Sequence, residues 1–242
     1  MTEALGGGGP VAPSGGWRMA TVAGVSKPKP RAVQLRLDVP DRVDHLPGQH
    51  YVVRLTAPDG YTAQRSYSVA SSPGDPLVEL FVERLPDGEV STHLADVVEP
   101  GDVLEVRGPI GGWFVWDGER PALLLGGGFG VVPFVSMLRT ARELGRTDLL
   151  RIAASSRTLS GLPYSDDLIE AGALIALTRI EYGIRPAGRL TPEDLVPLWE
   201  PGQTAYVCGS ASFAQGAADL LVGMGVPPAS IRVEQFGPTG AA

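Results

Sequence analysis

The chain has 242 residues, of which 43% are hydrophobic, so it is long enough to fill the cores of two modest domains. Its single cysteine, Cys208, excludes an internal disulfide and a four-cysteine iron–sulfur cluster, and we expect no metal site. No apolar run approaches the ~20 residues that a membrane span requires. The net charge of −7 disfavours nucleic acid as the main partner, and no basic-then-apolar signal opens the sequence, so we expect a soluble cytoplasmic protein.

The first part of the chain reads as a disordered lead followed by short strands. Residues 1–16 are rich in glycine and proline and poor in bulky apolar side chains, which predicts disorder. From Trp17 to about Trp116, short β-like segments are separated by turn signals such as PDG and EPGD. Strands are expected at 31–39, 50–57, 64–70, 77–85 and 102–108, with a helical turn at 91–98. This spacing predicts an antiparallel β-barrel domain over residues 17–117.

A different rhythm begins after the polar stretch DGERP at 117–121, where apolar strands alternate with helix-like segments. Strands are expected at 122–125, 149–155, 173–180, 204–209 and 231–236, and helices at 131–145, 164–171, 191–198 and 212–225. Such alternation predicts a Rossmann-like α/β domain over residues 118–242, with a parallel sheet covered on both faces and a C-terminal tail.

The stretch PALLLGGGFGVVP at 121–133 puts four glycines directly after the first strand of the second domain. Bare backbone there can approach a diphosphate, and the N-terminus of the next helix offers free N–H groups and a partial positive charge. Gly128 and Gly130 supply that backbone, and Pro133 suits a first helical turn. A tight strand-to-helix turn without a ligand is the alternative.

The barrel segment carries its own motif, RSYS at 65–68. In a regular strand, Arg65, Tyr67 and Val69 share one face. Arginine can form bidentate hydrogen bonds to a phosphate, tyrosine can pack against a planar ring, and serine can hydrogen-bond to a ring nitrogen. Ser91 is expected at a helix N-cap, which would make a second anion-binding helix start. A surface strand with polar side chains is the alternative.

Taken together and in order, these motifs resemble the ferredoxin–NADP reductase-like superfamily of flavoenzymes. The resemblance covers roughly residues 17–240 and rests on RSYS at 65–68, GEVS at 88–91, GPIGGWF at 108–114, GGGFGVVP at 126–133, CGS at 208–210 and EQFG at 234–237. It implies a flavin-binding barrel, a nicotinamide-binding domain and a redox centre in the cleft between them, here without a fused iron–sulfur domain.

The resemblance also implies roles for barrel residues. Arg65 would hold a flavin phosphate, Tyr67 would pack along the isoalloxazine, and Ser68 would bond near flavin N5, with Val69 beside them. The pyrophosphate would be held by Gly88, Val90 and Ser91, which favours FAD over FMN.

In the second domain, Gly128 and Gly130 would face the NAD(P) diphosphate. Cys208 and Glu234 would flank the nicotinamide C4, so they and Ser68 are the expected catalytic residues, and Phe236 would lie near the flavin or the adenine. The plainer alternatives are a buried small residue for Cys208, a strand-end charge for Glu234 and simple core for Phe236.

Two further positions bear on the dinucleotide. Relatives commonly carry a hydroxyl residue where this chain has Phe129, whose ring could block the nicotinamide, stack productively, or point into the interdomain core. Ser156 and Arg157 follow a strand near the expected adenosine ribose, and a guanidinium there suits a 2′-phosphate, which favours NADPH over NADH.

The sequence therefore predicts an FAD-dependent NAD(P)H oxidoreductase, a ferredoxin–NAD(P) reductase-like enzyme. It would pass hydride from nicotinamide to flavin N5 and then single electrons to a separate acceptor such as a ferredoxin. Arg139, Arg142 and Arg146, at helical spacing, are expected to form a docking patch for an acidic acceptor or else a solvated face. The alternative function is a flavin-binding electron-transfer or sensing subunit with degenerate nicotinamide binding, for which Phe129 is the main support.

Overall fold

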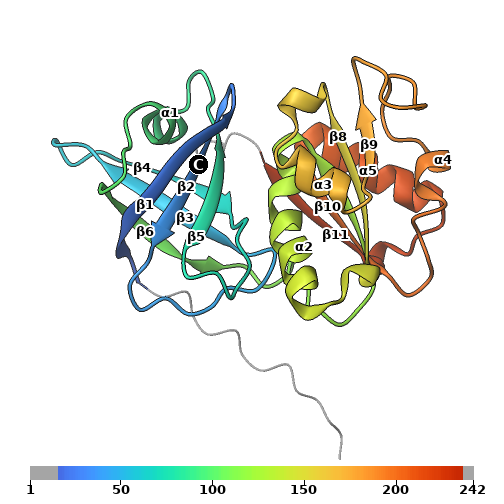
Figure 1. Cartoon of the computed structure of the whole chain (residues 1–242), viewed down its shortest axis with the longest axis horizontal. Helices are drawn as coiled ribbons and strands as arrows, with labels where there is room; N and C mark the ends of the chain where they lie inside the picture. The colour runs from blue at the N-terminus through green and yellow to red at the C-terminus, as the bar shows by residue number, and fades with distance from the viewer. Residues whose placement is uncertain (1–15, 237–242) are drawn as a thin grey trace, which may run out of the picture.

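The computed structural model describes residues 16–236, so the expected disordered lead, apart from Gly16, and the end of the C-terminal tail lie outside the described residues. Two domains stand side by side, a strand-rich one followed by one in which helices cover a sheet (Figure 1). The last strand of the first domain ends at Ile110 and the first strand of the second begins at Ala122. The expected boundary at 117/118 falls in this interval and stays a prediction.

The first domain is an antiparallel barrel, as predicted. Its strands are β1 (Arg18–Lys29), β2 (Ala32–Asp38), β3 (His50–Thr56), β4 (Thr62–Ser68), β5 (Val78–Glu83) and β6 (Val103–Ile110). They follow the order β4-β3-β6-β1-β2-β5, and a bridge between Val69 and Leu80 joins the end of β4 to β5 and closes the sheet. β1 was not among the expected strands, because its sequence contains Gly24 and Pro28, two residue types that are uncommon inside strands, and its register is irregular between Ser26 and Lys29.

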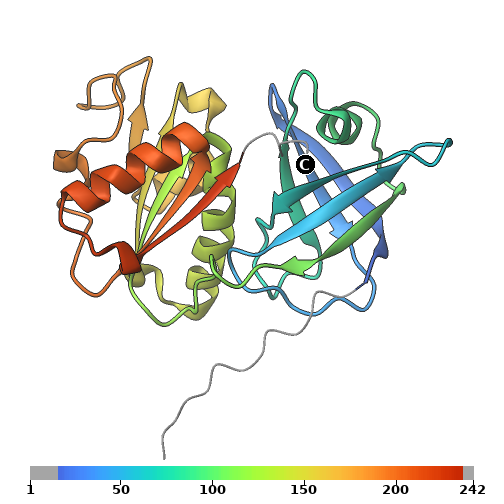
Figure 2. The same cartoon turned by 180° about the vertical axis from the view of Figure 1, so that it is seen from behind.

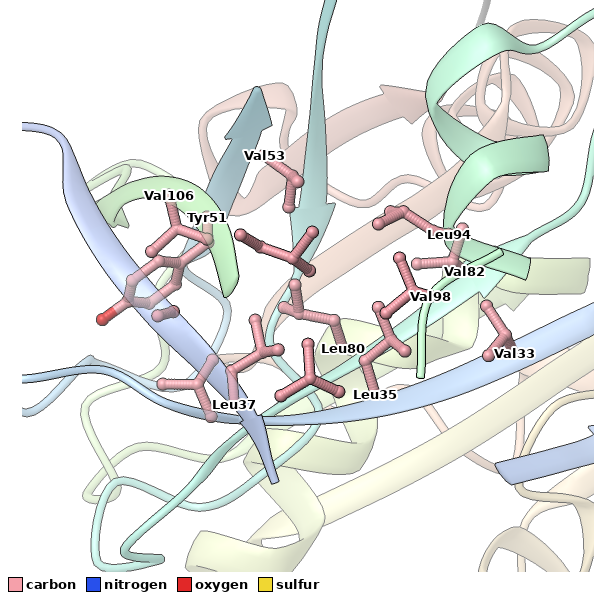
Figure 3. Packing of buried hydrophobic residues seen from close by; sticks show 14 of the residues in the cluster. Val33, Leu35, Leu37, Tyr51, Val53, Leu80, Val82, Leu94, Val98 and Val106 are labelled. Atoms are coloured by element: carbon pink, nitrogen blue, oxygen red, sulfur yellow. The ribbon is translucent and has the colours of Figure 1, made fainter. Parts of the chain in front are cut away.

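The barrel core is aliphatic. Leu35 and Leu37 of β2 meet Leu80 of β5, and Leu94 reaches into the same cluster from helix α1 (Glu89–Asp96) (Figure 3). Burying a leucine side chain contributes about 1.5–3 kcal/mol, so this cluster anchors α1 against the strands. The helix has the length of the expected turn, 8 residues, but it begins and ends two residues earlier.

The second domain is the predicted parallel α/β sheet. Its strands are β7 (Ala122–Gly127), β8 (Leu150–Ser156), β9 (Leu174–Leu177), β10 (Thr204–Ser210) and β11 (Ile231–Phe236), and its helices are α2 (Val132–Leu144), α3 (Ser165–Glu170), α4 (Pro192–Leu195) and α5 (Ala211–Gly223). The order β11-β10-β7-β8-β9 places the first strand of the domain at the centre of the sheet.

Helices cover both faces of this sheet, with α2 and α3 on one (Figure 1) and α5 on the other (Figure 2). Successive residues of β7 serve opposite faces: Leu124 packs on the α2 side, and Leu123 packs on the α5 side. A strand buried on both faces explains the continuous apolar run in the sequence. No helix within residues 16–236 combines the length and apolar character needed to cross a membrane.

The crossing segment at 111–121 is packed rather than loose. Phe114 and Trp116 belong to the apolar cluster of the second domain, and Trp116 is only 2% exposed. The carbonyl of Val115 accepts hydrogen bonds from the Tyr206 hydroxyl at 2.7 Å and from Arg232 at 2.9 Å. The segment therefore fixes the barrel against β10 and β11.

Candidate functional site

The glycine loop occupies the predicted place between β7 and α2. A 3₁₀ turn at Gly128–Val131 leads into α2, with Pro133 in its first turn. Gly128 has a φ of 55°, and no atom lies within 4 Å of the position a Cβ would take, so its backbone is open on that side. A Cβ on Gly130 would lie 2.1 Å from the Cys208 carbonyl oxygen. Gly128 thus presents free backbone, whereas Gly130 lets the loop pack against the end of β10.

Cys208 and Glu234 are neighbours across the β10–β11 pairing. The Cys208 thiol is fully buried, and burial raises its pKa well above the ordinary value, so it stays a neutral thiol. Burial also raises the pKa of the Glu234 carboxyl to about 7. Its Oε2 atom is buried without a hydrogen-bond partner within the described residues.

His50, at the start of β3, completes this group from the barrel side. Its Nδ1 atom lies 3.9 Å from Glu234 Oε1, and burial lowers the pKa of the imidazole. His50 also pairs in register with Ser68 at the end of β4. The sequence did not single out His50, because one histidine at the start of a strand carries no pattern.

The register therefore brings the three expected catalytic residues together at the domain junction. Ser68 is opposite His50, His50 faces Glu234, and Glu234 is opposite Cys208. The Ser68 Oγ atom is buried and has no hydrogen-bond partner in residues 16–236. The same holds for the Tyr67 hydroxyl, whose pKa is raised because the residue is buried.

The Val69 side chain lies in the barrel core, and the expected role of this residue beside a cofactor stays a prediction. Its side chain is 0% exposed in the barrel core, and its N–H is donated to the Gln49 carbonyl at 3.0 Å. The physical reason is barrel closure: the chain turns onto β5 at Val69, which directs the side chain inward.

The expected phosphate-binding part of the barrel lies at the start of α1. Gly88 is the N-cap residue, and no side chain caps the helix, so backbone N–H groups of its first turn are available to an anion. The Tyr61 hydroxyl donates to Glu89 at 3.0 Å and ties the helix start to the β4 hairpin. Arg65 is exposed on β4 and donates only to the Gln64 carbonyl within the described residues.

Ser91 is not the N-cap, which corrects the sequence prediction. It lies inside the first turn of α1, where its hydroxyl bonds to the Gly88 carbonyl and accepts from the Leu85 N–H, each at 3.2 Å. Val90 is 1% exposed in the barrel core. Of this trio, Gly88 is partly exposed, while the Val90 and Ser91 side chains are buried and hold the helix in place.

Phe129 packs between the domains. Its ring centroid lies 5.7 Å from that of Phe81 in β5, in a cluster with Ala32, Ala70 and Val132. Of the three orientations considered from sequence, these contacts favour the interdomain core.

The remaining expected residues lie at the carboxyl edge of the sheet. Phe236 ends β11 opposite Ser210 and packs partly buried against the α2-side core. Ser156 ends β8, and Arg157 follows it as an exposed residue whose carbonyl accepts from the Arg179 N–H at 3.2 Å. Both strands end on the edge that bears the glycine loop.

The arginine patch predicted on α2 is not present as an open patch. Arg139 pairs with the buried Glu79 across the domain boundary, and Arg142 pairs with Asp167 of α3. Arg146 lies beyond α2, because Gly145 ends the helix in the left-handed conformation. Two of the three charges are therefore paired within the molecule.

Comparisons with known proteins agree with this architecture. A profile of the family described as an oxidoreductase FAD-binding domain matches residues 22–115. Over 219 residues the chain is 29% identical to the 2-halobenzoate 1,2-dioxygenase electron transfer component of Burkholderia cepacia, covering 85% of this chain and 62% of that protein. Over 233 residues it is 26% identical to the naphthalene 1,2-dioxygenase system ferredoxin–NAD(P)(+) reductase component of Pseudomonas putida, covering 91% of this chain and 69% of that one.

A solved structure shares the whole fold. The ferredoxin NADP+ reductase of Neisseria gonorrhoeae, with bound FAD and NADP, superposes with a TM-score of 0.76 at 20% identity, over 90% of this chain and 98% of that chain. The chain spans less than two thirds of the length of the Burkholderia relative. The ordered motifs, the barrel followed by a parallel α/β sheet, and these similarities show that the chain belongs to the ferredoxin–NADP reductase-like superfamily of flavoproteins.

Proposed function

We propose that the chain is an FAD-dependent NAD(P)H oxidoreductase that passes electrons to a separate acceptor such as a ferredoxin. The observation that carries this proposal is the run of neighbouring polar groups at the domain junction, from Ser68 through His50 to Glu234. Ser68 Oγ and Glu234 Oε2 are both buried without a partner in residues 16–236. Buried polar atoms are seldom left unpaired, so a bound group that hydrogen-bonds to both fits this place.

The residues present fit a flavin on the barrel side. Ser68 would orient the ring through its free hydroxyl, and Tyr67 would pack along it. Arg65 and the uncapped start of α1 would hold two phosphate groups, which favours FAD over FMN. When bound, the nicotinamide supplies a hydride, and the flavin accepts it at N5 and releases the electrons one at a time.

The second domain would hold the dinucleotide along the edge of its sheet. Gly128 would offer its open backbone to the diphosphate, and Ser156 and Arg157 would receive the adenosine end. The barrel and the sheet would thus present the two rings to each other with little remaining freedom.

Glu234 would hold or release a proton beside the reacting rings. With a pKa of about 7, its carboxyl is present in both protonation states near neutral pH. His50 offers a second site for that proton 3.9 Å away.

The acceptor assignment rests on the names of the relatives, which are an electron transfer component and a ferredoxin–NAD(P)(+) reductase component. The paired arginines of α2 do not support it. A cytoplasmic location is part of this proposal, because NAD(P)H is a cytoplasmic metabolite, and cell fractionation tests it.

The alternative function, a flavin-binding subunit with degenerate nicotinamide binding, loses its main support. That support was a Phe129 ring in the nicotinamide pocket, and the ring instead contacts Phe81 of the barrel.

Two measurements test the proposal together. The yellow protein should release FAD on heating, and anaerobic mixing with NADPH or NADH should bleach its flavin band. Arg65→Ala should lose flavin during gel filtration while keeping its thermal melt, and Arg151→Ala, an equal change on the other domain, should retain it. A protein whose flavin is reduced by dithionite but by neither nucleotide would support the subunit function instead. Release of FMN would overturn the FAD assignment.

A further inference from the structure

Lysine is confined to one place in this chain. Of its 20 cationic residues only Lys27 and Lys29 are lysines, and both lie at the end of β1, in the stretch KPKPR that runs on through Arg31 into the turn before β2. Three cations within five positions stand out in a chain with a net charge of −7.

These cations line a pocket. An open pocket of about 740 Å³ lies between this turn, the end of β5 and the end of α1, with Arg84 and Asp96 on its far wall. Arg84 and Asp96 pair with each other at 2.8 Å. Within the described residues, Lys27, Lys29 and Arg31 form no ion pair with a carboxylate, so the residues that line the pocket carry a surplus of three positive charges. The partly buried Glu83 carboxylate lies near Arg31 and offsets part of that charge.

The turn is held in position. Pro28 and Pro30 each fix a φ angle, which limits the freedom of the turn. The Lys29 ammonium donates to the Ser165 hydroxyl at 3.1 Å, at the first residue of α3. The tip of the turn accordingly stands at the edge of the barrel nearest the second domain (Figures 1 and 2). Because the residues of this pocket are already held in position, binding an anion costs little additional conformational entropy.

We propose that this pocket, formed by Lys27, Lys29 and Arg31 against Arg84, binds a phosphate-bearing anion. A phosphate group carries up to two charges and several acceptor oxygens, which matches converging ammonium and guanidinium donors better than a single carboxylate does. The pocket volume falls in the range of about 300–1,000 Å³ typical of small-molecule sites. The phosphate belongs either to a free phosphorylated metabolite or to the 2′-phosphate of a dinucleotide held by the neighbouring domain.

The test uses inorganic pyrophosphate as the probe. Titrated into the full chain by calorimetry at low salt, it should bind saturably. The Lys27→Gln/Lys29→Gln variant should weaken that binding by about tenfold or more. Lys27→Gln alone, which leaves the Lys29–Ser165 bond in place, should also weaken it, whereas Arg146→Gln, an equal charge change elsewhere, should not. Unchanged affinity in the double variant, with an unchanged thermal melt, would overturn the proposal.

A second arm separates the two sources of phosphate. If pyrophosphate binding persists in saturating NADPH, the pocket takes a free metabolite. If NADPH blocks it and NADH does not, the pocket takes the 2′-phosphate. The readout is binding, not turnover, so a failure of the proposed reductase activity would leave this test intact.

Discussion

Arg139 of α2 donates a hydrogen bond to Glu79 of β5 at 2.8 Å, across the boundary between the two domains. The Glu79 side chain is 4% exposed and also accepts from the Tyr164 hydroxyl at 2.7 Å. Arg139 donates as well to the Ala70 carbonyl at 3.1 Å. One carboxylate of the barrel thus holds two elements of the second domain.

Removing one member of this ion pair should lower the free energy of unfolding substantially. Arg139→Met leaves the Glu79 charge buried without its partner, and such losses cost about 3–5 kcal/mol. Arg142→Met on the same helix breaks only solvent-accessible pairs with Asp167 and Glu170 and should cost about 0–1 kcal/mol. Urea unfolding of both variants checks this, and equal losses would contradict a special role for the buried pair.

The raised pKa of Glu234 makes a pH-dependent prediction. Because the folded value of about 7 lies above the ordinary 4.5, the folded chain binds this proton more tightly than the unfolded one does. The associated stability is present below pH 4.5 and is lost as the pH rises through about 7. Glu234→Gln cannot ionise, so its free energy of unfolding relative to wild type should rise by about 2–3 kcal/mol between pH 5 and pH 8.

Urea titrations of both proteins at several pH values in that range provide the measurement. A difference that stays constant across the series would mean that Glu234 titrates normally.

Truncating Phe129 should now act chiefly on stability. Phe129→Ser removes a partly buried ring from its contact with Phe81 and should cost about 2 kcal/mol, less than the 3–5 kcal/mol typical of a fully buried phenylalanine. Phe129→Leu should keep most of that packing. Thermal melts and anaerobic flavin reduction are measured side by side, and faster reduction at an unchanged melting temperature would restore the idea that the ring blocks the nicotinamide.

Arg157 bears on the choice of dinucleotide. If its exposed guanidinium meets a 2′-phosphate, Arg157→Ala loses a charge-assisted hydrogen bond of about 1.5–3 kcal/mol. The KM for NADPH should then rise about tenfold or more, with little change for NADH. Steady-state kinetics with both nucleotides, beside Arg146→Ala, test this, and equal increases would remove the preference for NADPH.

The sequence predicted the fold well where local pattern decides it. The continuous apolar run of β7 between turn signals, and the glycines that follow it, identify a buried strand and a tight loop without knowledge of distant contacts. The prediction from the sequence was less accurate where the local sequence pattern is weak. Ser91 looked like a cap, yet the helix begins at Glu89, because Gly88 already provides the extended N-cap conformation.

The errors at the site come from contacts between distant segments. The spacing of Arg139 and Arg142 places them correctly on α2, but nothing in that spacing tells that Glu79 and Asp167 would pair with them. His50 was missed for the same reason, since its neighbour Glu234 lies on the other domain.

The packed crossing segment has a consequence for how this molecule can be divided. Cutting the chain near residue 118 would strip Phe114 and Trp116 from the second domain and leave both halves with bare apolar surface. The two domains should therefore be kept together when this protein is fused to another. Neither half would serve as an interchangeable part, although each has its own sheet.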